Sequence, residues 1–266
     1  MKIFKILLIT FTLFVIVFFS LNIKLRILDS KNISFKNFNF QGIECIDNEI
    51  YIISNFDSKI YKLNKKLELE EFFDTTLLYE NRFIFSHITS FYIRDNIFYG
   101  VNSMDKINGV LVKVPVFEIE NKKKLSNSAY EIISLDSNIN HIEYHSNEDE
   151  ILVSHHYSSQ RKKNLLTIEV NGVKCDIENK LKIQNMYFEK KTKKLYIISN
   201  LISYHIGIIY KLTIDNFCNM QNINFFNIKN KEIIIFPFYE MEGYTICNDK
   251  EFFVYINNND SHIYIK

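Results

Sequence analysis

Glycine and proline are scarce in this sequence, and tryptophan is absent. Six glycines and two prolines in 266 residues are few for a protein with many tight turns. Asn and Asp must therefore form most of the turns, because both residues tolerate positive φ. The aromatic residues make up 15% of the sequence, and all of them are Phe or Tyr. Together with the many Ile residues, this composition favours strands over helices.

Common catalytic and nucleotide-binding motifs are also missing. The sequence contains no G-x-S-x-G, G-x-x-x-x-G-K-[ST], G-x-G-x-x-G or H-E-x-x-H pattern. Serine hydrolase, P-loop and Rossmann functions therefore have no motif support. The 32 basic and 31 acidic residues nearly cancel, giving a formal net charge of +1. No overall field indicates a nucleic-acid partner.

The four cysteines show neither a C-x-x-C pair nor the spacing of a zinc site. Cys175 and Cys218 occupy comparable places in successive repeats, so an extracytoplasmic domain would allow a disulfide between them. The alternative is four buried or free thiols. The sequence leaves both possibilities open.

The N-terminal region carries one long apolar run. After Lys2 and Lys5, the segment Ile6–Ile23 has 18 residues without a charge. As a helix it spans about 27 Å, close to the thickness of a bilayer core. Bulky residues stand where a signal peptidase needs small ones, which favours an uncleaved anchor over a removed signal. We expect a single-pass membrane protein with an extracytoplasmic C-terminal domain; residues 1–30 would be the anchor and connector.

Residues 31–266 contain a fivefold repeat. Apolar strands that follow polar Asn/Asp-rich turns begin near residues 50, 97, 151, 195 and 252, with spacings of 44 to 57 residues. Repeats of this length that hold several short strands are typical of propeller blades. The sequence predicts an all-β, five-bladed β-propeller, in which Ile33–Phe38 supplies the missing outer strand of the last blade. The alternative is an irregular β-sandwich.

The first strand of each blade should line a central channel. Alternate residues of these strands share a face, and the polar face carries Glu44, Tyr92, Glu143, Tyr187 and Thr245 at equivalent positions, together with Ser90, His141, His145 and Asn185. The apolar face would pack between blades. A further polar position precedes each strand: Gln41, Thr89, Asn140, Gln184 and Glu242. We predict a binding site at one mouth of the channel; the alternative is that these residues only solvate a water-filled channel.

The predicted ligand-binding residues are Gln41, Glu44, Tyr92, His141, Glu143, Tyr187 and Glu242. Within this set, His141, Glu143 and the nearby His145 alternate along one strand, a spacing that is compatible with metal ligation. The same spacing also arises in any strand that lines a polar channel.

Two stretches resemble known propeller families. Gln41-Gly42-Ile43 through Leu63, and Glu242-Gly243-Tyr244 through Ile265, are similar to the opening strand and hairpin of the strictosidine synthase and calcium-dependent lactonase group. The run Phe38–Ile43 also resembles the F-T-Q-G-L opening of plant-type glutaminyl cyclases. These resemblances imply an extracytoplasmic propeller, although Gln41 stands where the lactonases hold calcium with an acidic residue.

Two functions therefore compete. The first is a membrane-anchored extracytoplasmic propeller that binds a small molecule or a protein partner at the channel mouth, without catalysis. The alternative is a metal-dependent hydrolase or glutaminyl-cyclase-like enzyme that uses channel carboxylates such as Glu44, Glu143 and Glu242. The membrane, reached through the N-terminal helix, is the expected partner in both cases. The sequence predicts no particular cofactor.

Overall fold

The computed structural model describes most of the chain between residues 23 and 266. It leaves out residues 1–22, 28–31, 55–58, 75–77, 80–81, 84–87, 95, 103–109, 116–130, 135–137, 146–150, 159–162, 171–172, 182, 190, 202–205, 221, 225–227, 229, 236–239 and 258–259.

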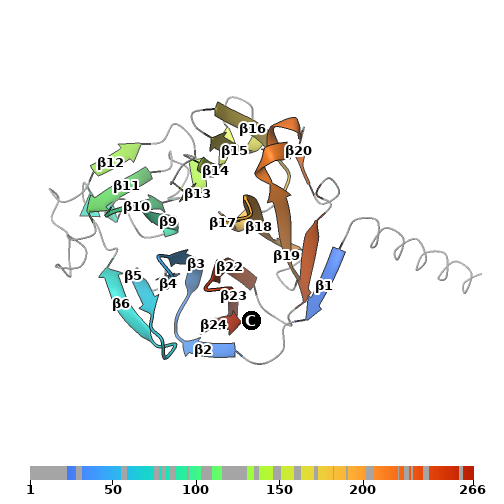
Figure 1. Cartoon of the computed structure of the whole chain (residues 1–266). Helices are drawn as coiled ribbons and strands as arrows, with labels where there is room; N and C mark the ends of the chain where they lie inside the picture. The colour runs from blue at the N-terminus through green and yellow to red at the C-terminus, as the bar shows by residue number, and fades with distance from the viewer. Residues whose placement is uncertain are drawn as a thin grey trace, which may run out of the picture.

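The described residues form a five-bladed β-propeller (Figure 1), as the sequence predicted. Blade 1 consists of β3 (Phe40–Ile46), β4 (Glu49–Ser54), β5 (Lys59–Leu63) and β6 (Leu69–Asp74). Blade 2 consists of β9 (Ile88–Arg94), β10 (Ile97–Asn102), β11 (Val110–Pro115) and β12 (Glu131–Ser134). Blade 3 consists of β13 (Asn138–His145), β14 (Ile151–Ser158), β15 (Lys163–Val170), β16 (Val173–Asn179) and the short β20 (Asn222–Ile223).

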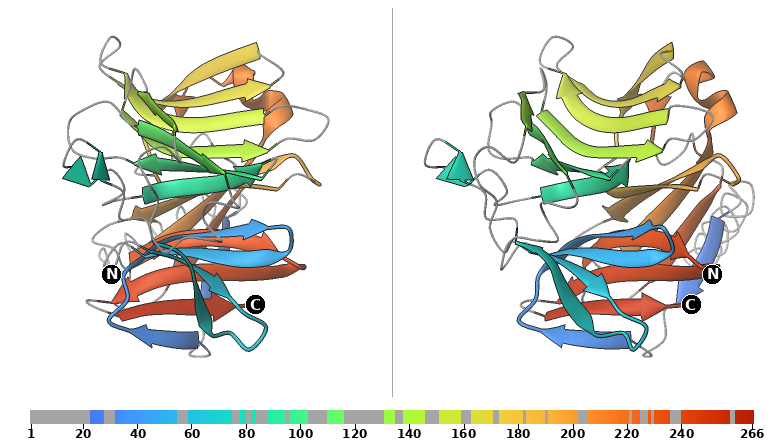
Figure 2. Two further views of the ribbon diagram at one scale, coloured as in Figure 1. Left: turned by 90° about the vertical axis from the view of Figure 1, so that its left-hand side faces the viewer. Right: turned by 60° about the vertical axis from the view of Figure 1, so that its left-hand side comes forward.

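Blade 4 consists of β17 (Ile183–Glu189), β18 (Lys194–Leu201), β19 (Ile206–Thr213), β21 (Lys231–Ile235) and β1 (Ile23–Ile27). Blade 5 consists of β22 (Glu240–Cys247), β23 (Lys250–Asn257), β24 (Asp260–Ile265) and β2 (Asn32–Lys36). A 3-10 helix, η1 (Ile214–Asn219), and a small hairpin of β7 (Leu78–Tyr79) and β8 (Arg82–Phe83) lie outside the blades. The inner strands β3, β9, β13, β17 and β22 each contact the inner strands of both neighbouring blades, and together they surround the axis of the ring (Figures 1 and 2).

The N-terminal strand β2 closes the ring. It pairs antiparallel with the C-terminal strand β24, with Ile33 opposite Ile263, which confirms the predicted closure. The crossing to blade 1 is fixed by the buried hydroxyl of Ser261, which accepts a hydrogen bond from the Phe40 amide at 2.8 Å and donates one to the Phe38 carbonyl at 2.7 Å. The last blade is therefore built from an early strand, β2, and the three C-terminal strands.

The strand that precedes β2 in the chain, β1, joins blade 4. It pairs in parallel with β21, with Ile23 opposite Lys231 and Arg26 opposite Ile234. This strand lies within the segment that the sequence analysis assigned to anchor and connector, and it includes Ile23, the last residue of the predicted membrane span. Residues 6–22 lie outside the described residues, so the span stays a prediction. Within the described part of the chain, no helix has the length and apolar character needed to cross a membrane.

Apolar side chains fill the spaces between the blades. Ile43 and Ile52 of blade 1 pack with Val254 and Ile263 of blade 5. Another cluster joins blades 4 and 5 through Tyr196, Ile198, Tyr244 and Phe253. A sheet that is covered on both faces buries consecutive residues of a strand, and Ile52 and Ile53 are accordingly both buried.

The tight turns use Asn and Asp, as the scarcity of glycine predicted. Positive φ angles occur at Asp47 (50°), Asn48 (65°), Asn248 (50°) and Asp249 (59°). Two consecutive residues with positive φ form the type I′ turn that matches the twist of a β-hairpin. These turns lie at one end of the ring, which we call the turn end.

The four cysteines form two disulfides. One joins Cys175 to Cys218, the pair that the sequence suggested, and the other joins Cys45 to Cys247. The second links the inner strands of blades 1 and 5 at the turn end, 202 residues apart in sequence. Two disulfides are typical of an oxidising, extracytoplasmic compartment.

Mild acid should destabilise the folded protein through protonation of His262, which lies in blade 5. This side chain stacks on Tyr255, with ring centroids 5.1 Å apart, and its burial lowers its pKa below the ordinary value of 6.5, against the opposing effect of Asp260. The unfolded chain therefore binds the proton more tightly, so stability is lost as the pH falls below about 6.5. In urea titrations at several pH values, His262→Phe should flatten this dependence. An unchanged pH profile in the variant would contradict the prediction.

Candidate functional site

Each inner strand of the propeller contains one bulged residue at the same place in the repeat. The pairing with the second strand of the blade skips one residue in every case: Gln41, Thr89, Asn140, Gln184 and Glu242. These are the five polar positions that the sequence analysis placed ahead of the first strands. A bulge redirects side chains and is typically found next to functional sites. The five bulges lie at the end of the ring opposite the turn end, which we call the bulge end.

Side-chain amides tie the bulge end together. Gln184 Nε2 donates a hydrogen bond to Glu240 Oε1 at 2.7 Å, and Gln41 Nε2 donates one to Asn39 Oδ1 at 2.6 Å. Asn200 of blade 4 donates to the Met241 carbonyl at 3.1 Å and accepts from the Met241 amide at 3.3 Å. Blades 4 and 5 are therefore fixed to each other at the edge of the site.

Asn185 lies one residue beyond the bulge of blade 4 and reaches the inner strand of blade 1. A Cβ on Gly42 would lie 3.6 Å from its Nδ2, although blade 5 separates blades 1 and 4 in the ring. The equivalent residue of blade 5 is Gly243, where a Cβ would lie only 2.9 Å from Ile43 Cγ2. The two glycines let the inner strands approach and leave room for the Asn185 amide at the centre of the ring.

The Asn185 amide is buried without a hydrogen-bond partner. The residue is 1% exposed, and neither Nδ2 nor Oδ1 bonds to any residue that the structure describes. On the next blade, Thr245 is fully buried, and its Oγ1 has no partner within the same described part of the chain. An unsatisfied buried polar group costs about 1–3 kcal/mol. These atoms are therefore candidates for contact with a ligand or an ordered water.

The two buried carboxylates of the predicted site lie on the inner strands of blades 1 and 5. Glu44 follows Gly42 by two residues and is 8% exposed, while Glu242 is the bulged residue of β22 and is 6% exposed. Both side chains have interactions within the protein. They place acidic groups on the same two strands that frame Asn185.

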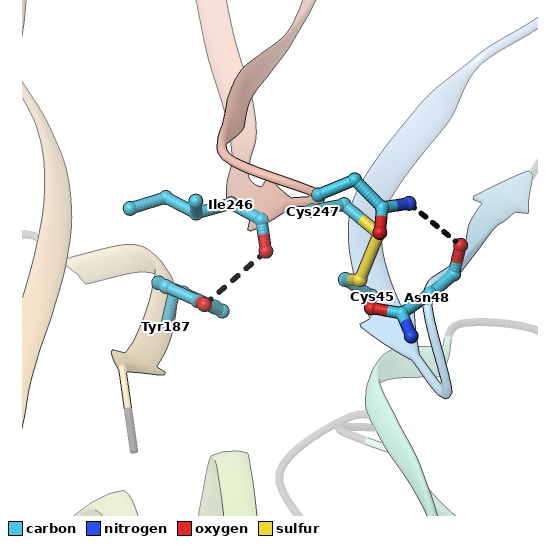
Figure 3. Close-up of a disulfide and its surroundings, with 6 residues drawn as sticks. Cys45, Asn48, Tyr187, Ile246 and Cys247 are labelled. Atoms are coloured by element: carbon cyan, nitrogen blue, oxygen red, sulfur yellow. Dashed lines mark hydrogen bonds between the residues drawn. A yellow bond between two sulfur atoms is a disulfide. The ribbon is translucent and has the colours of Figure 1, made fainter. Parts of the chain in front are cut away.

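The tyrosines of the predicted site contribute mainly to contacts within and between blades. The Tyr187 hydroxyl donates a hydrogen bond to the Ile246 carbonyl of blade 5 at 3.2 Å (Figure 3). Tyr92 stacks on Tyr99 of its own blade, with ring centroids 4.5 Å apart. The polar face of the inner strands therefore also packs on the next blade.

The remaining predicted residues, His141 and Glu143, lie in β13, where they pair with His155 and Val153. Their side chains lie outside the described part of the structure, so the metal hypothesis for this strand stays a prediction. Among the described residues, no group of three or more His, Cys, Asp or Glu side chains is arranged to hold a metal ion.

All seven predicted residues lie on inner strands: Gln41, Glu44, Tyr92, His141, Glu143, Tyr187 and Glu242. Two residues of the candidate site were absent from this set. Asn185 and Thr245 had been placed on the polar face, but short neutral side chains gave no reason to select them. The signal that distinguishes Asn185 is its alignment with Gly42 and Gly243, since small residues on neighbouring strands leave space for a side chain from another.

Comparison with known proteins finds only structural similarities at low sequence identity. No protein-family profile and no curated protein sequence matches this chain. Among solved structures, it is similar to virginiamycin B lyase from Staphylococcus aureus, with 10% identity, a TM-score of 0.42 and 88% of each chain covered. It is also similar to a streptogramin B lyase, with 11% identity, a TM-score of 0.44 and coverage of 90% of this chain and 97% of the other. A putative exported protein from Bacteroides fragilis matches at 11% identity and a TM-score of 0.44, over 91% of this chain and 77% of the other.

Proposed function

We propose that this protein is a membrane-anchored, extracytoplasmic propeller that binds a small polar ligand at the axis of the ring, without catalysis. The observation that carries the proposal is the unpartnered, buried pair of Asn185 and Thr245. Three buried polar atoms without partners would cost several kcal/mol in total. A protein whose net stability is about 5–15 kcal/mol retains such groups at a considerable cost, which a bound ligand offsets.

The residues indicate which chemistry the ligand has. The Asn185 amide offers one acceptor and a donor group, and the Thr245 hydroxyl offers both kinds. A matching ligand therefore both donates and accepts hydrogen bonds. It is small, because Asn185 Nδ2 lies 3.6 Å from the Cβ position of Gly42. The carboxylates of Glu44 and Glu242, on the strands beside it, favour a neutral or cationic ligand over an anionic one.

The disulfides and the N-terminal apolar run together support a membrane-anchored, extracytoplasmic location. The disulfides Cys45–Cys247 and Cys175–Cys218 are typical of an extracytoplasmic domain. The apolar run that precedes β1 supplies an anchor; because Ile23 belongs to β1, the run available for the membrane is residues 6–22, about 26 Å long as a helix. This length is at the short end of what spans a bilayer core.

Thr245→Val tests the ligand site, because valine has the shape of threonine without the hydroxyl. We expect the ligand-free variant to be about 1–2 kcal/mol more stable than the ligand-free wild type, since a buried unsatisfied group is removed, and we expect the variant to lose the ligand. Native mass spectrometry of the purified full-length protein should detect a small bound molecule in the wild type and not in the variant. Thr213→Val is the matched control, because Thr213 is exposed and its side chain makes no capping hydrogen bond.

Two results would contradict this proposal. A Thr245→Val variant that is less stable than the wild type and keeps its ligand content would show that the hydroxyl has only a structural role. Alternatively, a tightly bound divalent metal together with lactone-hydrolysing or glutaminyl-cyclising activity would replace the binding function by the enzymatic one.

A further inference from the structure

The N-terminal chain enters the propeller at the turn end. Strand β1 begins at Ile23, which lies opposite Lys231, and Lys231 lies opposite Tyr210 of β19. From Tyr210, strand β19 continues to Thr213, which pairs with Lys194. Lys194 begins β18, directly after the turn that connects β17 to β18. The apolar segment that precedes Ile23 in the sequence is therefore attached to the domain at this end.

The large apolar side chains that the described structure leaves exposed are also at the turn end. Val173 is 67% exposed and begins β16, where it pairs with Val170 next to the end of the β14 hairpin. Leu67 is 38% exposed in the turn between β5 and β6. Its φ is 65°, a conformation that is rare for leucine and costly to maintain. Val173 and Leu67 therefore expose apolar side chains to solvent at positions where a polar side chain would be better hydrated.

Lysines are the commonest exposed charged residues among the described residues of the turn end. The exposed lysines at the turn end are Lys24, Lys65, Lys66, Lys174, Lys191, Lys193, Lys194, Lys250 and Lys266. The exposed acidic residues there, within the described part of the chain, are Asp47, Glu49, Glu68, Glu70 and Asp249. Residues 146–150, which follow β13 in the sequence, include three further acidic residues and lie outside the described part of the chain. Among the described residues, the excess of positive charge therefore lies on blade 4, with a smaller excess on blade 5, beside the point where the chain enters; on blade 1 the exposed acidic residues outnumber the lysines.

We infer that the turn end of the propeller rests on a membrane surface that contains anionic lipids, so that the bulge end faces away from it. The inference depends on the N-terminal anchor of the proposed function. Lysines near a negatively charged leaflet are each attracted to it over about a Debye length. Exposed apolar side chains in turns can enter the interfacial region, while the anchor holds the domain within reach. The arrangement leaves the bulged residues of the candidate site open to the extracytoplasmic space.

The test places an environment-sensitive fluorophore on single introduced cysteines of the full-length protein. The structure contains no free cysteine among its described residues. Val173→Cys and Leu67→Cys report on the turn end, and Asn164→Cys, an exposed residue next to the β14–β15 connection, reports on the bulge end. In vesicles that contain phosphatidylserine and a lipid-borne quencher, we expect several-fold stronger quenching at positions 173 and 67 than at position 164.

Charge reversal separates surface docking from simple tethering. Lys191→Glu with Lys250→Glu should reduce the quenching at position 173, whereas Lys36→Glu, which changes an exposed lysine of β2, should not. Equal quenching at all three labels, or stronger quenching at position 164, would overturn the inference. Release of the full-length protein from membranes by alkaline carbonate would overturn both the anchor and the docking. Ligand detection by native mass spectrometry would be unaffected by either result.

Discussion

Replacing Cys45 and Cys247 together by serine is expected to lower the free energy of unfolding by several kcal/mol. The disulfide closes a loop of 202 residues, and the chain-entropy model gives about 5 kcal/mol for a loop of that length. The bond also fastens the inner strand of blade 1 to that of blade 5, at the seam that β2 closes on the outside. Urea unfolding of the purified variant, beside the wild type under oxidising conditions, measures the effect.

The matched control is the double replacement of Cys175 and Cys218. That disulfide spans 43 residues and joins β16 to η1, away from the seam. The same model gives about 4 kcal/mol for it, so the Cys45/Cys247 variant should be the less stable of the two. If removal of the Cys45–Cys247 bond left the midpoint of unfolding unchanged, it would contribute nothing to closing the ring.

Arg26→Met is expected to cost about 3–5 kcal/mol, because it leaves a buried charge without its main partner. Arg26 of β1 forms an ion pair with Glu232 of β21, which is 1% exposed, and a second with Glu251 of blade 5 at 2.7 Å. Tyr244 donates a further hydrogen bond to Glu251 at 2.9 Å. Despite the cost of desolvation, the pairing with Arg26 holds the pKa of Glu251 below its ordinary value. Arg26 thus joins the N-terminal strand to two blades.

Lys24→Met provides a control on the same strand. Lys24 also approaches Glu232, at 3.9 Å, but its side chain is 67% exposed. An exposed ion pair contributes about 0–1 kcal/mol, so this variant should unfold almost like the wild type in the same urea titration. Lys211, 3.3 Å from Glu232, partly offsets the loss of Arg26. Equal destabilisation by the two variants would show that β1 is not fixed by this buried pair.

The sequence predicted the fold in several particulars. Repeat length indicated propeller blades, and Ile33–Phe38 was identified as the closing strand, whose observed range is Asn32–Lys36. The register within the blades was harder to predict. Pairing with the inner strands makes Ile50, Phe98, Leu152, Leu195 and Glu251 equivalent. The repeat alignment was therefore displaced by one residue in blades 2, 3 and 5. Strands buried on both faces lack the alternation that fixes register.

Contacts between the ends of the chain were the least predictable. Cys45 and Cys247 meet only because the ring closes, whereas Cys175 and Cys218 come from adjacent repeats. Strand β1 was missed because Ile23 continues an apolar run that also suits a membrane span. Its buried Arg26 gave no signal of its own, since the partners Glu232 and Glu251 are more than 200 residues away.

The candidate site was partly predictable. The five bulged positions stood out as polar residues ahead of the inner strands, and alternation placed Asn185 and Thr245 on the polar face. Their isolation from hydrogen-bond partners depends on how closely three blades approach at Gly42 and Gly243. No periodicity in the sequence contains that information.

A crystal structure of the full-length protein, purified without added ligands, tests the central claim most directly. The proposal predicts electron density for a small molecule between Asn185 and Thr245, within hydrogen-bonding distance of the Asn185 amide and Thr245 Oγ1, and its loss in Thr245→Val. Density that holds only a single water at both side chains, unchanged in the variant, would contradict the proposal that this propeller binds a ligand at its axis.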